Sequence, residues 1–242
     1  MIGVTENLRK IRDLLDTAAT DAGRDPDTVE LVAVSKLQPL EKLLEAADAG
    51  QRHFGENTVQ EGLDKVTKLT RKGLTWHFIG HLQSNKTRAV AEHFDWVHTV
   101  DRLKTARRLS DQRPADRGPL NVCLQVNIDA EAAKSGVSPE ALAELAAAVG
   151  ELPRLKLRGL MCLPAIRNSF AEQRLPFARL RRLSEDLAAQ GGPGIVMDTL
   201  SMGMTGDYRA AVFEGATMVR IGTAVFGPRQ ASFASQADVH AV

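Results

Sequence analysis

The sequence predicts a single (β/α)₈ barrel of the TIM-barrel class, with one additional helix at its N-terminus. Eight short apolar segments alternate with amphipathic helical segments, and strict alternation is typical of a parallel sheet. Eight such units fit within 242 residues, the usual size of a closed barrel. The absence of a Gly-x-Gly-x-x-Gly turn and of a Walker sequence disfavours the alternative, an open doubly wound sheet. No linker rich in Gly, Pro and Ser divides the chain, so residues 1–242 are interpreted as one domain.

The N-terminal half combines the additional helix with four strand–helix units. Leu8, Ile11 and Leu15 recur at helical spacing, and Gly23 ends this helix. Asp101 follows the fourth strand and can cap the next helix. The expected strands cover residues 31–36, 52–57, 76–80 and 96–100, and the expected helices cover residues 39–50, 58–72, 85–93 and the segment after Asp101.

The C-terminal half repeats this rhythm without repeating the sequence. Pro139 can open one of its helices, whereas Pro176 can interrupt another. The tail after Pro228 is composed mainly of Ser, Ala and Gln and is compatible with a final short helix. The expected strands cover residues 120–127, 157–163, 195–201 and 218–222, and the expected helices cover residues 139–150, 172–190 and 207–214.

The composition excludes several classes of protein. The 31 basic and 30 acidic residues are interspersed and leave a net charge of +1, so we expect no nucleic-acid partner. No apolar run approaches the ~20 residues of a membrane span, and the N-terminus becomes charged too soon for a signal peptide. Cys123 and Cys162 lie in separate apolar segments, which argues against a disulfide framework or a zinc site and suits a reducing cytoplasm.

Lys36 lies where the first strand leaves the core. Partial burial of its head would favour the neutral amine, which is a nucleophile toward aldehydes and can form a Schiff base. The alternative is a lysine that simply returns to water at the end of a strand. Lys36 by itself does not decide between these interpretations.

The last two units contain a second candidate feature, a pair of small-residue turns. Barrels often bind phosphate with the loops after strands seven and eight, and Ser201-Met-Gly203 with Gly222-Thr223 have the composition for it. The alternative is an ordinary tight turn. Arg220 should point the same way as Gly222, into the barrel, where it needs an anion or an acceptor. An internal salt bridge, for example to Glu56, is the structural alternative.

The histidines do not form a convincing metal site. His77 and His81 are four residues apart, but His77 lies in a predicted strand and no third ligand is evident, so we expect no metal. His77 is interpreted either as a hydrogen-bonding residue at the edge of the core or as a wall of a planar ligand's pocket. Cys162, between Met161 and Leu163, is interpreted as a buried apolar residue.

Several motifs together resemble one known family, the pyridoxal phosphate homeostasis proteins (proline synthetase co-transcribed homologues). The matching stretches span nearly the whole chain, and their combination is specific. They are Ala33-Val-Ser-Lys36, His53-Phe-Gly-Glu-Asn57, His77-Phe-Ile-Gly-His-Leu-Gln-Ser-Asn-Lys86, Val100-Asp101, Lys134-Ser-Gly136, Arg158-Gly-Leu-Met161, Ser201-Met-Gly-Met204, Met218-Val-Arg-Ile-Gly-Thr223 and Phe226-Gly227.

The resemblance implies a barrel like the N-terminal domain of alanine racemase, with pyridoxal 5′-phosphate held as a Schiff base on Lys36. It also implies that Arg220 faces the pyridine nitrogen, which would then stay unprotonated and be a weaker electron sink. By the same resemblance Ser201, Gly203, Gly222 and Thr223 surround the phosphate, and Asn57 and His77 line the ring. Leu37 and Gln38 depart from the family pattern and leave Lys36 the only amine on its turn.

The expected function is that of a non-catalytic carrier of pyridoxal phosphate in intracellular vitamin B6 and amino-acid homeostasis. We expect a cytoplasmic monomer that serves apo-enzyme clients and has neither a membrane nor a nucleic acid as partner. One alternative is a pyridoxal-phosphate-dependent amino-acid racemase, for which His77 and Cys162 are the only rough candidates for a second base. Another is a barrel that binds a different phosphorylated metabolite and uses Lys36 as an aldolase-type lysine. Lys134 is a hypothetical second amine near the mouth, with a solvated loop lysine as the alternative.

Overall fold

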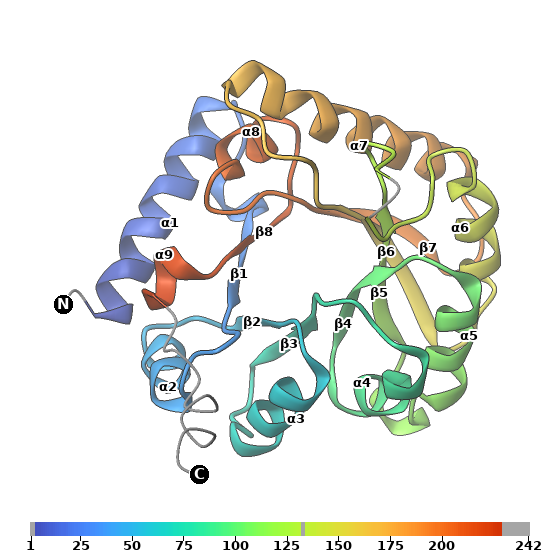
Figure 1. Ribbon diagram of the computed structural model, residues 1–242, viewed down its shortest axis with the longest axis horizontal. Helices are drawn as coiled ribbons and strands as arrows, with labels where there is room; N and C mark the ends of the chain where they lie inside the picture. Colours follow the sequence, from blue (N-terminus) through green and yellow to red (C-terminus); the bar gives the residue numbers. More distant parts are fainter. Residues whose placement is uncertain (1–2, 132–133, 229–242) are drawn as a thin grey trace, which may run out of the picture.

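Eight parallel strands close into a barrel within residues 3–131 and 134–228, the part of the chain that the computed structural model describes. Each strand pairs with its neighbours in chain order, and the last returns to the first (Figure 1). The predicted TIM-barrel fold is therefore confirmed. The strands are β1 (Glu30–Val34), β2 (His53–Glu56), β3 (Thr75–Phe78), β4 (Trp96–Val100), β5 (Leu120–Val126), β6 (Leu155–Cys162), β7 (Ile195–Ser201) and β8 (Met218–Ile221).

The helices form a ring outside the strands (Figure 1). Short 3₁₀ turns precede β1, α4 and β5, at Pro26–Thr28, Ser84–Lys86 and Ala115–Arg117. The α-helices are α1 (Val4–Asp21), α2 (Leu40–Asp48), α3 (Val59–Lys68), α4 (Thr87–His93), α5 (Leu103–Gln112), α6 (Leu142–Gly150), α7 (Phe170–Gln190), α8 (Tyr208–Phe213) and α9 (Thr223–Phe226).

Three local predictions need correction. Asp101 does not cap α5, because the helix begins after Arg102, and the Asp101 carboxylate pairs with the Arg102 side chain instead. Pro176 does not interrupt α7, which begins earlier than expected with a Ser169–Glu172 capping box. Pro139 lies in a turn that precedes α6. The short helix α9 was not expected, and the predicted C-terminal helix falls outside the described residues.

The strands separate two apolar clusters because successive side chains point to opposite faces. Leu31 and Ala33 of β1 belong to the large cluster between the strands and the helices. Val32, which lies between them in sequence, belongs to a small cluster inside the barrel with Trp96, Cys123, Met161 and Met218. Residues that share the inward face with this small cluster are therefore enclosed by the sheet itself.

The additional N-terminal helix completes the outer ring. Helix α8 has only six residues, and α1 lies beside α8 and α9 in Figure 1. The buried α1 residues Leu8, Ile11 and Leu15 fall on one face of that helix, as their spacing predicted, and pack into the large cluster. Among the described helices, none combines the length and the apolar character needed to cross a membrane.

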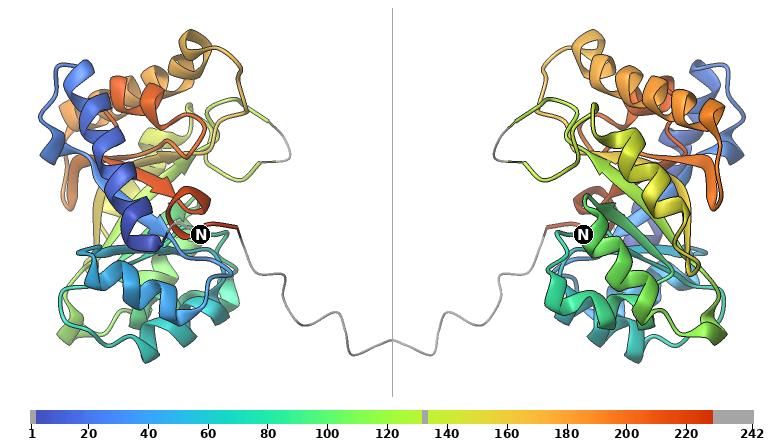
Figure 2. Two further views of the ribbon diagram at one scale, coloured as in Figure 1. Left: turned by 90° about the vertical axis from the view of Figure 1, so that its left-hand side faces the viewer. Right: turned by 90° about the vertical axis from the view of Figure 1, so that its right-hand side faces the viewer.

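The loops at the carboxyl ends of the strands differ in length. In parallel barrels these ends meet at one face, where active and binding sites are built. Figure 2 shows the connections that follow β5 and β6 projecting together from the barrel. The first strand ends at Val34, two residues before the predicted end, so that Ser35 and Lys36 belong to the turn that follows it.

Candidate functional site

A cavity of about 420 Å³ opens at the carboxyl ends of the strands. Five of the eight residues predicted for a binding site line it together. They are contributed by the loops after β1 and β2, by β8, and by the junction between β8 and α9. These residues are Lys36, Asn57, Arg220, Gly222 and Thr223.

Lys36 reaches the cavity from a tight turn. The next residue, Leu37, has a positive φ of 58°, which costs energy for a residue with a branched side chain, so the surroundings must hold this turn in place. Within residues 3–131 and 134–228, no hydrogen bond or ion pair engages the Lys36 side chain. The amine is therefore free to react with a ligand in the cavity.

Lys65 of α3 holds the Lys36 turn from outside the barrel. Its ammonium donates to the backbone oxygen of Ser35 at 2.6 Å and to the carboxylates of Glu56 at 2.8 Å and Glu61 at 2.7 Å. Glu61 in turn accepts a hydrogen bond from the backbone N–H of Leu37. The residues on both sides of Lys36 are thus bound to one cluster of charges.

Glu56 makes this cluster costly to disrupt. It is the last residue of β2, points outward toward α3, and has no exposed surface. Burial raises the pKa of Glu56, and the Lys65 ammonium opposes this shift. Removal of one partner from such a buried pair leaves an uncompensated charge, so the pair fixes the geometry of the turn.

Arg220 is a buried cation at the floor of the cavity. Its side chain donates from Nη1 to the Ser201 hydroxyl at 2.7 Å and from Nη2 to the backbone oxygen of Cys162 at 3.0 Å. The alternative of an ion pair with Glu56 is wrong, because Glu56 points out of the barrel to Lys65. No carboxylate of the described chain lies within ion-pair distance of Arg220. A buried guanidinium that retains its charge in this way favours a ligand with an acceptor or a negative charge.

Glycines let two loops form the wall next to Arg220. Gly203, after β7, has a φ of +92°, and a Cβ there would lie 2.6 Å from the Cβ of Ala211. Its backbone oxygen accepts a hydrogen bond from the backbone N–H of Arg220. A Cβ on Gly222 would lie 3.0 Å from the backbone oxygen of Val34. Gly203 therefore needs to be glycine, and a side chain at Gly222 would crowd the Val34 backbone.

Three predicted site residues do not line the cavity. The loop residue Gly203 lies next to Met204, which does. The Ser201 hydroxyl is fully buried and engaged by Arg220 and His98. His77 is also fully buried, with both ring nitrogens bonded to other histidines. Of its two interpretations, the structure places His77 as a hydrogen-bonding residue of the barrel interior.

Residues not predicted to belong to the site complete the lining. Each lies within a few residues of a strand's carboxyl end, so the barrel prediction located their neighbourhood but could not select individual side chains. They are Val34, Gln38, Ile79, Gly80, His81, Leu163, Met204 and Thr205.

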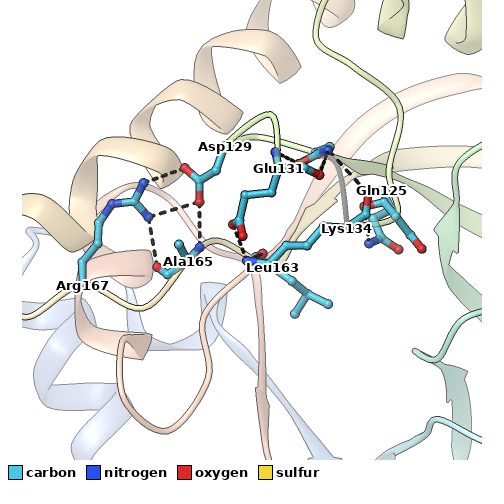
Figure 3. A network of polar contacts seen from close by, with 9 residues as sticks. Gln125, Asp129, Glu131, Lys134, Leu163, Ala165 and Arg167 are labelled. Atoms are coloured by element: carbon cyan, nitrogen blue, oxygen red, sulfur yellow. Dashed lines mark hydrogen bonds and ion pairs between the residues drawn. The ribbon is translucent and has the colours of Figure 1, made fainter.

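The loops after β5 and β6 are tied together beside the cavity (Figure 3). Asp129 accepts hydrogen bonds from Arg167 at 2.6 Å and from the backbone N–H of Ala165 at 2.7 Å. Lys134 forms an ion pair with Glu131 at 2.6 Å. Lys134 also lines a second hollow of about 310 Å³ that shares wall residues with the first cavity. The predicted position of Lys134 near the mouth agrees with this geometry, and its role stays a prediction.

Metal ligation finds no support in the geometry. No group of three or more His, Cys, Asp or Glu side chains suited to a metal ion occurs in the described part of the chain. His77 lies inside the barrel, whereas His81 is exposed at the cavity mouth, so the two do not act as a ligand pair.

Comparison with known proteins first defines the class. Residues 6–230 match the family model of the alanine racemase N-terminal domain. The structure of alanine racemase from Corynebacterium glutamicum has the same fold, with a TM-score of 0.66 and 14% identity over 95% of this chain and 62% of that one. The cavity described above thus lies in an alanine-racemase-type barrel.

More similar relatives identify the family within this class: the chain belongs to the pyridoxal phosphate homeostasis proteins. The protein of that name from Pseudomonas aeruginosa is 56% identical over 229 residues, covering 95% of this chain and 97% of the relative. The one from Escherichia coli K12 is 52% identical over 235 residues, covering 96% and 99%. The structure of PipY from Synechococcus elongatus with PLP bound matches with 38% identity and a TM-score of 0.81, over 93% of this chain and 100% of that one. The resemblance stated from the motifs is confirmed.

The Lys65 cluster generates a prediction about stability. Lys65→Met should lower the free energy of unfolding by about 3–5 kcal/mol at neutral pH, because Glu56 stays buried without its cation. A carboxyl with a raised folded pKa stabilises the protein fully below its unfolded pKa, and this contribution is lost as the pH rises through the folded value. Without the Lys65 ammonium, which opposes the effect of burial, the folded pKa of Glu56 rises further in the variant than in the native chain. The stability deficit of the variant relative to the native chain should therefore grow between about pH 5 and about pH 8, as measured by urea denaturation.

Lys68→Met is the matched control for this prediction. Lys68 lies on the same helix and pairs with Asp64 at an exposed position, so its loss should change stability little at either pH. An equal deficit for Lys65→Met at both pH values would contradict the assignment of the buried charge to Glu56.

Proposed function

We propose that this chain binds pyridoxal 5′-phosphate in the cavity at the carboxyl ends of the strands and carries it in vitamin B6 homeostasis. One observation carries the proposal. A single cavity joins an amine without a partner in the described chain, a buried cation without a carboxylate there, and two glycine-containing loops. The PLP-bound relative PipY and the names of the curated relatives support this proposal.

The Lys36 amine suits the aldehyde of the cofactor. When bound, the cofactor would supply an aldehyde carbon, to which the Lys36 nitrogen would bond while the aldehyde oxygen leaves as water. The cluster around Lys65 holds the backbone on both sides of Lys36, so the side chain starts from a fixed point at the edge of the cavity. Asn57, which is also in the lining, is proposed to lie against the ring.

The loops after β7 and β8 suit the phosphate. Gly203, Gly222 and Thr223 are proposed to surround it, with the Thr223 hydroxyl as a donor. The Ser201 hydroxyl is already hydrogen-bonded to Arg220 and His98. Ser201 is therefore proposed to support the phosphate loop from the barrel interior and not to contact the phosphate itself. His77 is likewise proposed to act through its neighbours and not at the face of the ring.

Arg220 suits the pyridine nitrogen. A guanidinium can donate a hydrogen bond to this nitrogen but cannot readily give up a proton. Burial lowers the pKa of Arg220, yet arginine remains the charged partner at any ordinary pH. A ring bound here would therefore stay unprotonated and would withdraw electrons weakly, which suits holding the cofactor better than stabilising a carbanion.

The residues around the cavity favour a carrier over a racemase. Burial raises the pKa of the Cys162 thiol to about 12, and burial beside His98 and His53 lowers the pKa of His77 well below its usual value. Neither group lines the cavity, and neither does Tyr208. Of the lining residues His81 is the one imidazole, and it is exposed at the mouth. We therefore propose a role without catalysis.

Cys123 and Cys162 are both free and buried, which supports a reducing compartment such as the cytoplasm. We propose that the chain acts as a monomer and passes the cofactor to apo-enzymes, with the open mouth of the cavity as the exit.

Lys36→Ala should abolish covalent cofactor binding. The native protein incubated with pyridoxal phosphate should absorb at the edge of the visible range, and borohydride reduction followed by mass mapping should place the label on Lys36. The matched control Lys134→Ala, at the neighbouring hollow, should keep this absorbance. A label that maps to a residue other than Lys36 would refute the anchor.

Arg220→Ala should weaken cofactor retention while the barrel stays folded. The loss of one hydrogen bond from a charged donor corresponds to about tenfold faster release or more. Release should be followed by transfer to an apo-enzyme in excess, with far-UV circular dichroism as the check on folding. Unchanged release would remove Arg220 from the proposed site.

Racemisation should be absent. The loaded protein incubated with L-alanine and other amino acids should show no conversion to the D-enantiomer by chiral chromatography. Robust turnover that disappears in Lys36→Ala would favour the racemase alternative, and His81→Ala would then test the one imidazole of the lining.

A further inference from the structure

Five side chains form a continuous hydrogen-bonded chain across the interior of the barrel. Arg220 Nη1 lies 2.7 Å from Ser201 Oγ, which lies 2.7 Å from His98 Nδ1. His98 Nε2 lies 2.8 Å from His77 Nδ1, and His77 Nε2 lies 2.9 Å from His53 Nδ1. The residues belong to β8, β7, β4, β3 and β2, so the chain connects strands that are far apart in sequence.

This hydrogen-bonded chain of side chains runs from one face of the barrel to the other. Arg220 lines the cavity at the carboxyl ends of the strands. His53 is the first residue of β2 and lines a hollow of about 410 Å³ on the opposite face, together with Glu30, the first residue of β1. His53 Nε2 lies 3.6 Å from a Glu30 carboxylate oxygen, an ion-pair contact longer than a hydrogen bond.

Arg220 determines the direction of the hydrogen bonds. A guanidinium only donates, so Ser201 Oγ accepts from it and has one hydrogen left to donate. His98 Nδ1 is the other partner of this oxygen within the described chain, so it accepts that hydrogen. A neutral His98 then has its hydrogen on Nε2 and donates to His77 Nδ1, and His77 donates in the same sense to His53.

The reverse direction is unfavourable at both ends. If His98 donated from Nδ1, the Ser201 hydroxyl hydrogen would be buried without an acceptor, at a cost of about 1–3 kcal/mol. At the other end, a lone pair of His53 Nε2 would face the Glu30 carboxylate. One arrangement satisfies both ends, and in it every ring has its hydrogen on Nε2.

The two central histidines are held neutral by their surroundings. His77 and His98 have no exposed surface, and His77 stacks on Trp96 with ring centroids 5.6 Å apart. Burial, with the Arg220 cation nearby, lowers the pKa of His98 to about 3. A charged ring here would oppose Arg220 inside the barrel.

We infer that His98, backed by His77, is a positioning residue that orients Arg220 toward the cavity through Ser201. As a fixed acceptor, His98 keeps the Ser201 oxygen lone pair turned to Arg220, and the bond to Cys162 fixes the second guanidinium nitrogen. The charge of Arg220 is thereby held in place without a described carboxylate in ion-pair contact. The effect on retention of a bound cofactor rests on the proposed function, whereas the direction of the hydrogen bonds from Ser201 to His53 does not.

The first test reads the histidine hydrogens directly and needs no cofactor. Long-range ¹H–¹⁵N correlation spectra of the ¹⁵N-labelled protein, assigned with His77→Gln and His98→Asn, should show both rings as neutral Nε2–H tautomers. These signals should stay unchanged between about pH 8 and about pH 5, because buried histidines resist protonation. An Nδ1–H tautomer or a charged ring at His98 would overturn the inference even for a protein that never binds the cofactor.

The second test compares two substitutions of His98. Asparagine can accept from Ser201 with its amide oxygen near the original Nδ1 position, whereas leucine fills similar space and accepts nothing. His98→Leu should release the cofactor about fivefold faster, the fold-change that corresponds to one lost hydrogen bond. His98→Asn should release it close to the native rate, and Glu30→Gln, at the exposed far end, should also leave release unchanged.

The outcomes of the second test separate the two proposals. Equal release from His98→Leu and His98→Asn would overturn the positioning role, because only one of them keeps the acceptor. Equal folded fractions by circular dichroism are required for this comparison. If His98→Leu does not fold, the tautomers of the native protein decide the question. If the native protein takes up no cofactor, the proposed function fails, and the histidine tautomers still test the direction of the hydrogen bonds behind Arg220.

Discussion

The charge of Arg220 inside the barrel is the constraint on which the rest of the site depends. A guanidinium in this position needs acceptors, and Ser201 and the Cys162 backbone provide two. Because no carboxylate of the described chain lies within ion-pair distance of Arg220, neutral groups suit the interior around it, and burial keeps His98 and His77 neutral. A ligand that offers an acceptor or an anion is then favoured in the cavity, in agreement with the proposed binding of pyridoxal phosphate.

A second buried polar cluster lies on the outer face of the sheet. Glu56 and Lys65 form a buried pair between β2 and α3, and this pair binds the backbone on both sides of Lys36. Because separating these buried charges is energetically unfavourable, the pair stabilises a turn in which Leu37 has a strained, positive φ. The reactive amine and the buried cation are positioned independently, one from outside the strands and the other from inside, and both meet in one cavity.

The fold and the outline of the site were predictable because they follow local rules. Alternation of apolar segments with helices predicted the barrel, and the carboxyl ends of strands predicted where Lys36, Asn57, Arg220, Gly222 and Thr223 would meet. Interior partners were less predictable. His77 has the same strand context whether it lines a pocket or bonds other histidines, and Glu56 could have paired with Arg220 or Lys65, since the pattern of one strand does not show what packs against it.

The sequence by itself determined the fold class, the family and the amine that faces the cavity, because periodicity, chain length and short motifs are properties of neighbouring residues. Only the tertiary structure decided that Ser201, His98, His77 and His53 bond in one line behind Arg220, and that Lys65 supports Lys36. The reason is geometric. Closure of the barrel brings β8 and β7 across from β4, β3 and β2, and hydrogen bonds between them depend on distances that no single segment encodes.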